Sequence, residues 1–459
     1  MVRGRAPAAV TAALAAVLVA FFLISSGCRG SSRSGDAGEG GSPSPRFKAR
    51  AFAGTELRVL ANDHPWIHHN VGRIKEFTEA TGITVSFDIY PEEQFRVKRT
   101  VEMLSGISGY DAFMIMPGNS LSEYHDRGWV ENLDPYFARK DLAWPDFALD
   151  DIYPNALEAG TRDGHRYSLP VLLETSILAY NKRLFAEYGV AVPRTMGELE
   201  RAARTVYKGS GGRIAGISLR GRDASATSQW ADFLHSFGGA WVSADGFAAI
   251  DSPEALEALR FYGRLLRDYG PRDATRNGWY ESVSLFTRGE AAMIFDANLF
   301  RTQYEDAETS LVEDEVGYAI LPAGPAGSVP HVSHWALAIN PLSRRKNAAW
   351  YYVQWASSRR EALAAHLAGI PSARPSVWRD PAVASGDSAP DWTAASTNSY
   401  ELATYQWNPP VNDTASARIA VGEAIVAAIL DQDLELAAHR ASVKLNAILS
   451  KERRTGTEQ

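Results

Sequence analysis

"ELRVLAN" (56–62) is the first of five segments that alternate in character, and the others are "NVGRIKEFTEATG" (70–82), "ITVSFDIY" (83–90), "PEEQFRVKRTVEMLSG" (91–106) and "YDAFMIM" (110–116). The first, third and fifth are short and rich in β-branched and other apolar residues, which predicts strands. The second and fourth have the apolar spacing of amphipathic helices, and each ends in a glycine. This alternation of strand and helix is typical of an α/β fold with a doubly wound sheet.

Ligands of doubly wound sheets bind at the carboxyl ends of the strands. Here those ends are "ANDHPW" (61–66) and "MPGNS" (116–120). They supply candidate side chains for a polar ligand, namely Asn62, Asp63, His64, Trp66 and Asn119.

The N-terminal segment has the layout of a secretory signal. Arg3 and Arg5 precede a stretch without charge that runs to Gly27, and Cys28 is the only cysteine of the 459 residues. The small residues before Cys28 resemble a bacterial lipobox, which predicts a signal peptide over residues 1–27 and a lipid on the Cys28 thiol. Ser25 stands where the lipobox pattern prefers leucine. A plain signal peptide or an uncleaved membrane anchor is the alternative.

Residues 28–54 are dominated by glycine, serine and proline at their start, which predicts a flexible tether. A single cysteine excludes an internal disulfide. The body that follows is long enough for two domains. Without residues 1–27, which hold two arginines and no acid, the net charge changes from −7 to −9. An acidic body argues against a nucleic-acid partner.

Several longer motifs resemble those of bacterial family 1 extracellular solute-binding proteins, which include the maltose-binding protein and supply ABC importers. They are "YSLPVLLETSILAYNKRLFAEYGVAVPRTMGELERAA" (167–203), "SLFTRGEAAMIFDANLF" (284–300), "VGYAILPAGP" (316–325), "SHWALAINPLSRRKNAAWYYVQWASS" (333–358) and "GIPSARPSVW" (369–378). The motifs occur in the order found in the family.

The resemblance implies a periplasmic-binding-protein fold of two α/β lobes, joined by crossover strands near 171–175 and 315–318. Lobe one is expected to hold residues 55–172 and 317–356, and lobe two residues 173–316 and 357–459. The resemblance also implies a monomer outside the cytoplasm that delivers its ligand to ABC permease subunits. No enzyme activity, cofactor or metal is expected.

A carbohydrate is the expected ligand, because flat aromatic faces suit sugar rings and polyols and charged acceptors suit their hydroxyls. Tryptophan is abundant, and the candidates beyond Trp66 are Trp230, Trp279, Trp335 and Trp407. Each of them can also be an ordinary core residue, as we expect of Trp350 and Trp355. Alignment with the family motifs adds the polar candidates Glu174, Asp296 and Asn298. The aromatic residue that the family has after Asn298 is either replaced by Leu299 or displaced to Phe300.

Other functions find little support in the sequence. A non-sugar solute or a sensor role on the same fold is the main alternative, and a secreted hydrolase with two placed carboxylates is another. "GISLRGRD" (216–223) has the glycine spacing of a P-loop but lacks its lysine and hydroxyl residue. "HPWIHH" (64–69) places three histidines close together, which leaves a zinc site as a further alternative.

Overall fold

The computed structural model describes residues 46–107, 109–145, 147–386 and 388–456. The predicted signal peptide, Cys28 and most of the predicted tether lie outside these residues. Within the described ranges, no helix combines the length and the apolar character that a membrane span requires.

Of the nine strands in the described residues, seven form one mixed sheet, and the two shortest form a separate hairpin. The strands are β1 (Glu56–Asn62), β2 (Thr84–Tyr90), β3 (Ala112–Ile115), β4 (Thr161–Arg162), β5 (His165–Arg166), β6 (Leu169–Asn181), β7 (Met293–Ala297), β8 (Val316–Ala319) and β9 (Val332–Ile339).

Helices make up most of the remaining structure. The first nine are α1 (Pro65–Thr81), α2 (Glu92–Ser105), α3 (Pro117–Asp126), α4 (Asp134–Phe137), α5 (Pro154–Ala159), α6 (Lys182–Tyr188), α7 (Met196–Gly209), α8 (Asp223–Ser236) and α9 (Pro253–Tyr269). The others are α10 (Trp279–Thr287), α11 (Arg301–Tyr304), α12 (Lys346–Ala356), α13 (Arg359–Leu367), α14 (Pro375–Trp378), α15 (Pro381–Gly386), α16 (Pro390–Leu402), α17 (Thr414–Ile429) and α18 (Leu434–Gly456). Four short 3-10 helices are η1 (Lys140–Leu142), η2 (Leu149–Asp151), η3 (Ala274–Arg276) and η4 (Asn298–Phe300).

The five segments that open the sequence fold as predicted into β1, α1, β2, α2 and β3. β1 pairs in parallel with β2 and β3. Helix α1 ends at Gly82 and α2 at Gly106, and both glycines adopt the left-handed conformation that glycine tolerates. Helix α1 begins earlier than expected, at Pro65, because His64 acts as its N-cap and accepts a hydrogen bond from the backbone N–H of Trp66.

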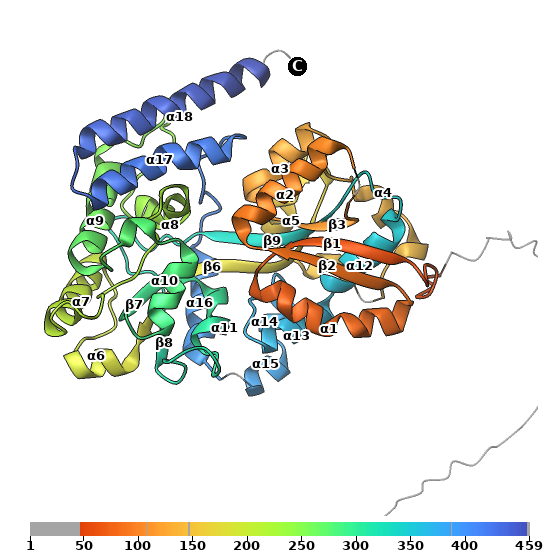
Figure 1. Ribbon diagram of the computed structural model, residues 1–459, viewed down its shortest axis with the longest axis horizontal. Coiled ribbons are helices and arrows are strands. Elements are labelled where there is room, and N and C mark those ends of the chain that lie inside the picture. Colours follow the sequence, from red (N-terminus) through yellow and green to blue (C-terminus); the bar gives the residue numbers. More distant parts are fainter. Residues whose placement is uncertain (1–45, 108, 146, 387, 457–459) are drawn as a thin grey trace, which may run out of the picture. The chain divides into compact units, whose positions relative to one another are not determined.

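Strand β6 links two parts of the sheet and is the feature that organises the molecule. Its first half, up to Thr175, pairs antiparallel with β9, which in turn pairs with β3. Its second half, from Ser176, pairs antiparallel with β7 and β8. Figure 1 shows β6 and β9 passing between the elements α1–α4 and the elements α6–α10.

Three clusters of buried side chains surround this sheet. The first core packs around β1, β3, β9 and the first half of β6. The second and third cores lie on opposite faces of β7: Met293 and Phe295 enter the second core, and Ile294 enters the third. This is the alternation that strand geometry imposes.

The described chain changes cores more than twice, and two of these changes involve β6 and β9. Leu173 belongs to the first core, whereas Ile177 and Leu178 belong to the third and second. Tyr318 belongs to the third core, and the chain rejoins the first core at Val332. The assignment of residues to lobes remains a prediction.

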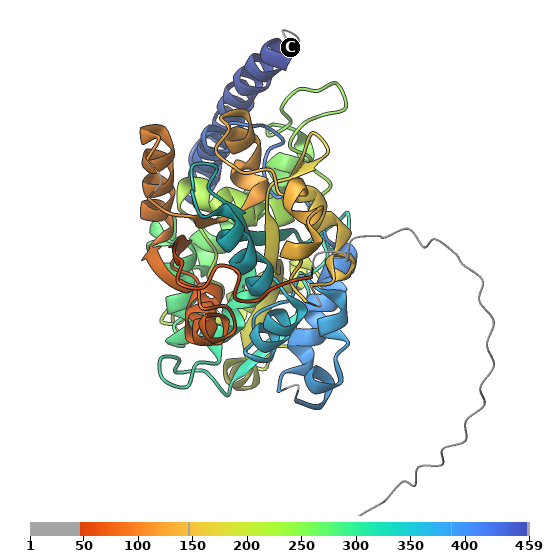
Figure 2. The same cartoon turned by 90° about the vertical axis from the view of Figure 1, so that its right-hand side faces the viewer.

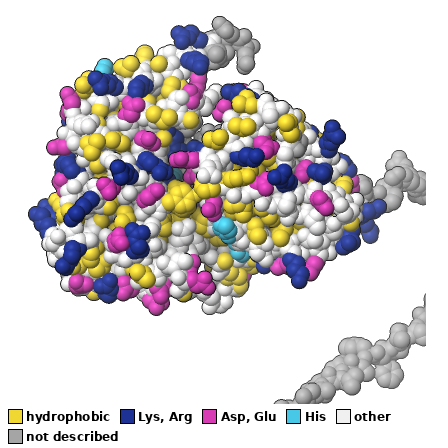
Figure 3. All heavy atoms as spheres, viewed as in Figure 1, with side chains coloured by type: hydrophobic (Ala, Val, Ile, Leu, Met, Phe, Trp, Pro, Cys, Tyr) yellow, Lys and Arg dark blue, Asp and Glu magenta, His cyan; other side chains and the backbone are white. Residues whose placement is uncertain are grey.

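Both views of the ribbon show α17 and α18 next to each other, with the C-terminal turns of α18 projecting beyond their neighbours (Figures 1 and 2). Figure 3 shows basic and acidic side chains interspersed over the face turned to the viewer, with hydrophobic groups between them. This mixture gives the face no large field of one sign.

Candidate ligand-binding site

A cavity of about 70 Å³ lies where β6 changes its partners, and it adjoins a second cavity of about 440 Å³. Glu92, Arg96, Arg220, Trp279 and Arg418 line both cavities, so the two form one continuous cleft, called here the pocket and its mouth. Eight of the predicted ligand-binding residues line the pocket: Asn62, His64, Asn119, Glu174, Trp279, Asp296, Trp335 and Trp407. Phe300 lines it as well.

The floor of the pocket is made by β6 and β9 and carries a buried carboxylate. Glu174 on β6 is 7% exposed. One of its oxygens lies 3.2 Å from Nε2 of His64, and the other accepts a hydrogen bond of 3.4 Å from the hydroxyl of Ser333 on β9. Close by, Asn62 at the end of β1 has a buried side-chain oxygen without a hydrogen-bond partner among the described residues. The floor therefore offers acceptors for hydroxyl groups.

A buried ion pair forms another wall of the pocket. Asp296 on β7 accepts a hydrogen bond of 2.8 Å from Nε of Arg220 and a second from its Nη2. Burial opposes the charge of Arg220, but the neighbouring carboxylate of Asp296 outweighs that effect and raises the pKa of the guanidinium above its ordinary value. The two hydrogen bonds hold the side chains of Arg220 and Asp296 in place.

Aromatic rings supply the apolar surfaces. Trp279, at the start of α10, stacks between Tyr280 and Phe300, with ring centroids 3.4 and 5.0 Å away. Trp335 on β9 packs against His64 at 5.3 Å, and Trp407 stacks on His331 at 5.8 Å with an angle of 19° between the rings. Flat surfaces next to charged acceptors are the combination that a carbohydrate needs.

Hydrogen bonds join the two sides of the cleft. The indole N–H of Trp279 donates to Glu92, the first residue of α2, at 3.2 Å. At another point, the amide of Asn408 donates to the side-chain oxygen of Asn119 on α3 at 2.7 Å. These contacts connect residues far apart in the sequence and narrow the pocket.

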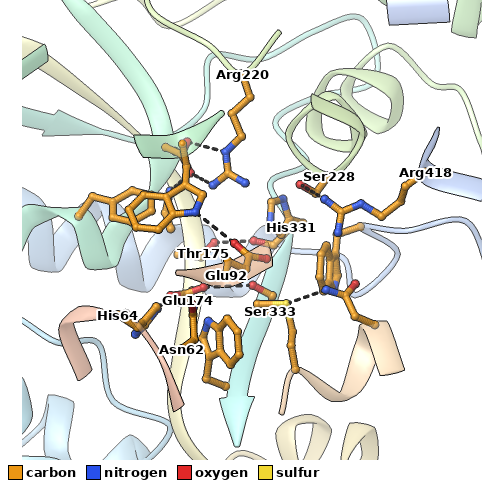
Figure 4. Close-up of a pocket in the computed structure, with 18 of the residues that line it drawn as sticks. Asn62, His64, Glu92, Glu174, Thr175, Arg220, Ser228, His331, Ser333 and Arg418 are labelled. Carbon is orange, nitrogen blue, oxygen red and sulfur yellow. Dashed lines mark hydrogen bonds and ion pairs between the residues drawn. The ribbon is translucent and has the colours of Figure 1, made fainter. Parts of the chain in front are cut away.

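Arg418, on α17, is the remaining basic group of the pocket. Its Nε donates to the carbonyl oxygen of Ala224 at 2.9 Å, and its Nη2 donates to the hydroxyl of Ser228 at 3.3 Å. Burial lowers the pKa of its guanidinium from the ordinary value, and nearby Arg96 lowers it further. Figure 4 shows Arg418 and Ser228 on the side of the pocket away from Asn62 and His64.

Four predicted site residues lie outside the pocket lining. Trp230 is fully buried in the second core against Trp241, and Trp66 is buried in the first core. Asp63 pairs with the exposed His68 at 2.7 Å. The side-chain oxygen of Asn298 accepts a hydrogen bond of 3.2 Å from the backbone N–H of Thr175, so Asn298 braces the floor of the pocket from behind.

Sequence reasoning missed several residues of the pocket, which are Glu92, Arg96, Met116, Thr175, Arg220, Ser228, Ala297, His331, Ser333 and Arg418. One signal could have identified Glu92, because it follows β2 directly and so lies at the same sheet edge as Asn62. Arg220 and Arg418 meet in the pocket from distant parts of the chain, and no local pattern marks them.

The three histidines of residues 64–69 do not gather around one point. His64 contacts Glu174 and His68 contacts Asp63. In the part of the chain that the structure describes, no group of three or more histidine, cysteine or acidic side chains could hold a metal ion.

Two of the relatives are named as binding proteins for polyols. Over 342 residues the chain is 28% identical to the erythritol/L-threitol-binding protein of Mycolicibacterium smegmatis, covering 71% of each. It is 31% identical over 243 residues to the mannitol-binding protein of Pseudomonas aeruginosa, covering 51% of this chain and 53% of that protein.

Solved structures share the fold. A solute-binding protein of Agrobacterium radiobacter in complex with ribitol has a TM-score of 0.77 and 24% identity, and the match covers 86% of this chain and 99% of that one. Maltose-bound MalE3 of T. maritima has a TM-score of 0.76 and 24% identity, and the match covers 85% of this chain and 99% of that one. The predicted two-lobe α/β fold is confirmed.

The family model described as bacterial extracellular solute-binding protein matches residues 72–362, which is more than half of the chain. The match includes the crossing strand β6 and most of the residues that line the pocket. The chain belongs to the bacterial extracellular solute-binding protein family.

Proposed function

We propose that this protein is the carbohydrate-binding subunit of an ABC importer and that it takes a small sugar or polyol into the pocket. One observation carries the proposal: stacked aromatic rings and buried, oriented carboxylates face a single cavity on the floor formed by β6 and β9. Such a site satisfies hydroxyl groups and the apolar faces between them.

The relatives support this ligand class. Two relatives are named for erythritol or L-threitol and for mannitol, and similar folds hold ribitol, D-mannitol or maltose. The small inner cavity suits a ligand of the size of a short polyol. These relatives bind solutes and are not named as enzymes, which favours binding over hydrolysis.

The proposed mechanism is closure of two lobes about β6 and the segment that returns to β9. We propose that the lobes exchange at Thr175–Ser176 and again just before Val332, where the chain changes cores. A ligand that contacts both sides favours the closed arrangement, which the permease then recognises. The bonds from Trp279 to Glu92 and from Asn408 to Asn119 stabilise that arrangement.

We further propose that Cys28 carries the lipid that holds the protein on the outer face of the cell membrane. The family is described as extracellular, in agreement with export. A bacterial lipoprotein carries more than one acyl chain, and two or more chains give durable attachment where one is marginal. An anchored protein remains concentrated near its permease.

A thermal-shift screen tests the ligand class. A ligand that binds only the folded protein raises the melting temperature, and its stabilisation grows with the logarithm of the ratio of its concentration to its dissociation constant. We expect polyols and small sugars to raise it, and amino acids and divalent metals to leave it unchanged. A shift with amino acids or metals alone would contradict the proposal and favour a non-sugar solute. Release of product from a glycoside would favour a hydrolase.

A further inference from the structure

Every arginine that lines the pocket has a carboxylate partner, with one exception. Arg220 pairs with Asp296, Arg96 with Glu92, and Glu174 contacts His64. Within the described ranges, no carboxylate oxygen of an aspartate or glutamate lies within 4.0 Å of a guanidinium nitrogen of Arg418, which is the limit for an ion pair. Its hydrogen bonds go to the neutral oxygens of Ala224 and Ser228.

Burial of the charged Arg418 side chain lowers the stability of the folded protein when no ligand is bound. Arg418 is only 8% exposed, and its guanidinium lies over the ring of Trp407 at 6.0 Å. The carboxylates of Glu92 and Asp223, which form no ion pair with Arg418, offset the cost of its burial only in part, so the pKa of Arg418 stays below its ordinary value. Arg418 nevertheless faces both the pocket and its mouth, where an entering solute must pass. Such a cation is compensated when an anion arrives.

We propose that Arg418 binds the carboxylate of an acidic carbohydrate, of the aldonic or uronic acid class. This inference rests on the proposed function and names the ligand class more narrowly. A guanidinium forms short, charge-assisted hydrogen bonds with a carboxylate, frequently two at once. Part of the guanidinium fork of Arg418 is free for them, because the bonds to Ala224 and Ser228 use Nε and Nη2.

The other side of the pocket fixes the orientation of the ligand. Asn62 presents a buried oxygen without a hydrogen-bond partner in the described structure, and Glu174 presents a carboxylate. Both accept hydrogen bonds and repel or reject an anion. The hydroxyl-bearing end of the ligand therefore lies toward Asn62 and Glu174, and its carboxylate lies toward Arg418 and Ser228, across the pocket (Figure 4).

The test compares ligands that differ only in one terminal group. Calorimetric titrations of the full chain use the pairs erythritol and erythronate, ribitol and ribonate, mannitol and mannonate, and glucose and glucuronate. For at least one pair the acid should bind about tenfold or more tightly than its neutral partner, the range for a bond to a charged group. The preference should shrink as salt concentration rises.

Variants assign the preference to one residue. Arg418→Gln should reduce the ratio of acid to neutral affinity to less than about threefold, while Arg418→Lys should keep part of it. Arg183→Gln is the matched control, because the side chain of Arg183 lines neither the pocket nor its mouth, is 55% exposed and already contacts Glu187 and Glu315. That variant should keep the ratio of the wild type.

Two results overturn the inference and leave the proposed function intact. In the first, the neutral ligand of every pair binds as tightly as its acid or more tightly. In the second, the preference for the acid survives in Arg418→Gln. If no carbohydrate of either kind binds, the proposed function and the inference are both overturned. The melting temperature of each variant shows that it is folded, and the wild-type comparison of paired ligands stands without any variant.

Discussion

Glu174 illustrates how one residue can serve both the fold and the ligand. Its carboxylate is buried on β6 between His64 and the hydroxyl of Ser333. A buried carboxylate would be expensive without these partners. A carboxylate has about four acceptor sites, so the two contacts leave room for ligand hydroxyls.

Replacing Glu174 by alanine should weaken ligand binding about ten- to a hundredfold, because each lost hydrogen bond to a charged group is worth roughly 1.5–3 kcal/mol. Isothermal titration of the ligand found in the thermal-shift screen measures the change. Glu174→Gln is the matched control, since it keeps the shape and one acceptor oxygen, and it should lose less affinity. A lower melting temperature with unchanged affinity would mean that Glu174 only holds His64.

His334, on β9, should make the protein less stable in acid. Burial lowers the pKa of His334 from 6.5 to about 4. Between these two values the unfolded chain binds a proton that the folded chain does not, so stability is lost as the pH falls from 6.5 toward 4. The loss between pH 7 and pH 5 is roughly 2 kcal/mol.

Urea denaturation at pH 7 and pH 5 tests this prediction. His334→Leu should show a smaller loss than the wild type by roughly 2 kcal/mol, because it has no proton to bind. His68→Leu is the control, since the side chain of His68 is 61% exposed, and its loss should match that of the wild type. Equal losses in all three proteins would contradict the prediction.

At the scale of elements, β6 shows which parts of the secondary structure and strand pairing could be predicted from the sequence and which could not. The five segments of residues 56–116 were predictable because period and caps are local signals. The changeover of β6 was expected near residues 171–175 from the family resemblance, and the pairing changes at Thr175–Ser176. Its neighbours in the sheet come from residues more than a hundred positions later, and no local pattern specifies them.

The site was predictable only in part for the same reason. Residues at the ends of strands, such as Asn62 and Asp296, follow from strand position and from motif alignment. The sequence does not distinguish a tryptophan that contacts the ligand from one that packs in a core, because a buried indole can do either. Trp230 lies in the second core, and Trp279 lines the pocket. Arg418 depends on how α17 packs against α8, which is tertiary information.

The contact between α10 and α2 should help to hold the cleft closed. Trp279→Phe keeps a ring for stacking on Tyr280 and Phe300 but removes the N–H that donates to Glu92. Ligand affinity should therefore fall about tenfold, the low end for a bond to a charged group. Trp230→Phe is the matched control, because the indole N–H of Trp230 is buried and has no hydrogen-bond partner in the described structure. It should lower the melting temperature and leave affinity nearly unchanged, and equal affinity losses in both variants would contradict the prediction.

At the scale of the whole molecule, ligand should make the protein more compact. The two sides of the cleft come together around the solute, so the radius of gyration measured by small-angle scattering should fall while the circular dichroism spectrum stays the same. Trp279→Phe without ligand should be at least as extended as the wild type without ligand. Identical dimensions with and without saturating ligand in both proteins would contradict closure.

Anchoring also belongs to the whole molecule, and it is tested at Cys28, which lies outside the described residues. In a bacterial host that processes lipoproteins, the wild type should take up labelled palmitate and fractionate with membranes. Cys28→Ala should remain unlabelled, because the thiol is the site of lipid transfer. Ser31→Ala, a neighbouring change in the predicted tether, should label as the wild type does. Equal labelling of the wild type and Cys28→Ala would contradict the prediction that Cys28 carries the lipid.

The late position of β9 has a consequence for biosynthesis. β9 lies between β3 and β6 in the sheet, yet both of these strands leave the ribosome long before residues 332–339 do. Until then, β3 and the first half of β6 lack the strand that joins them, and the first core lacks one of its central layers. A growing chain therefore cannot finish this core until residues 332–339 are made, and until then the edges of β3 and of the first half of β6 stay open on the side that β9 covers in the finished sheet.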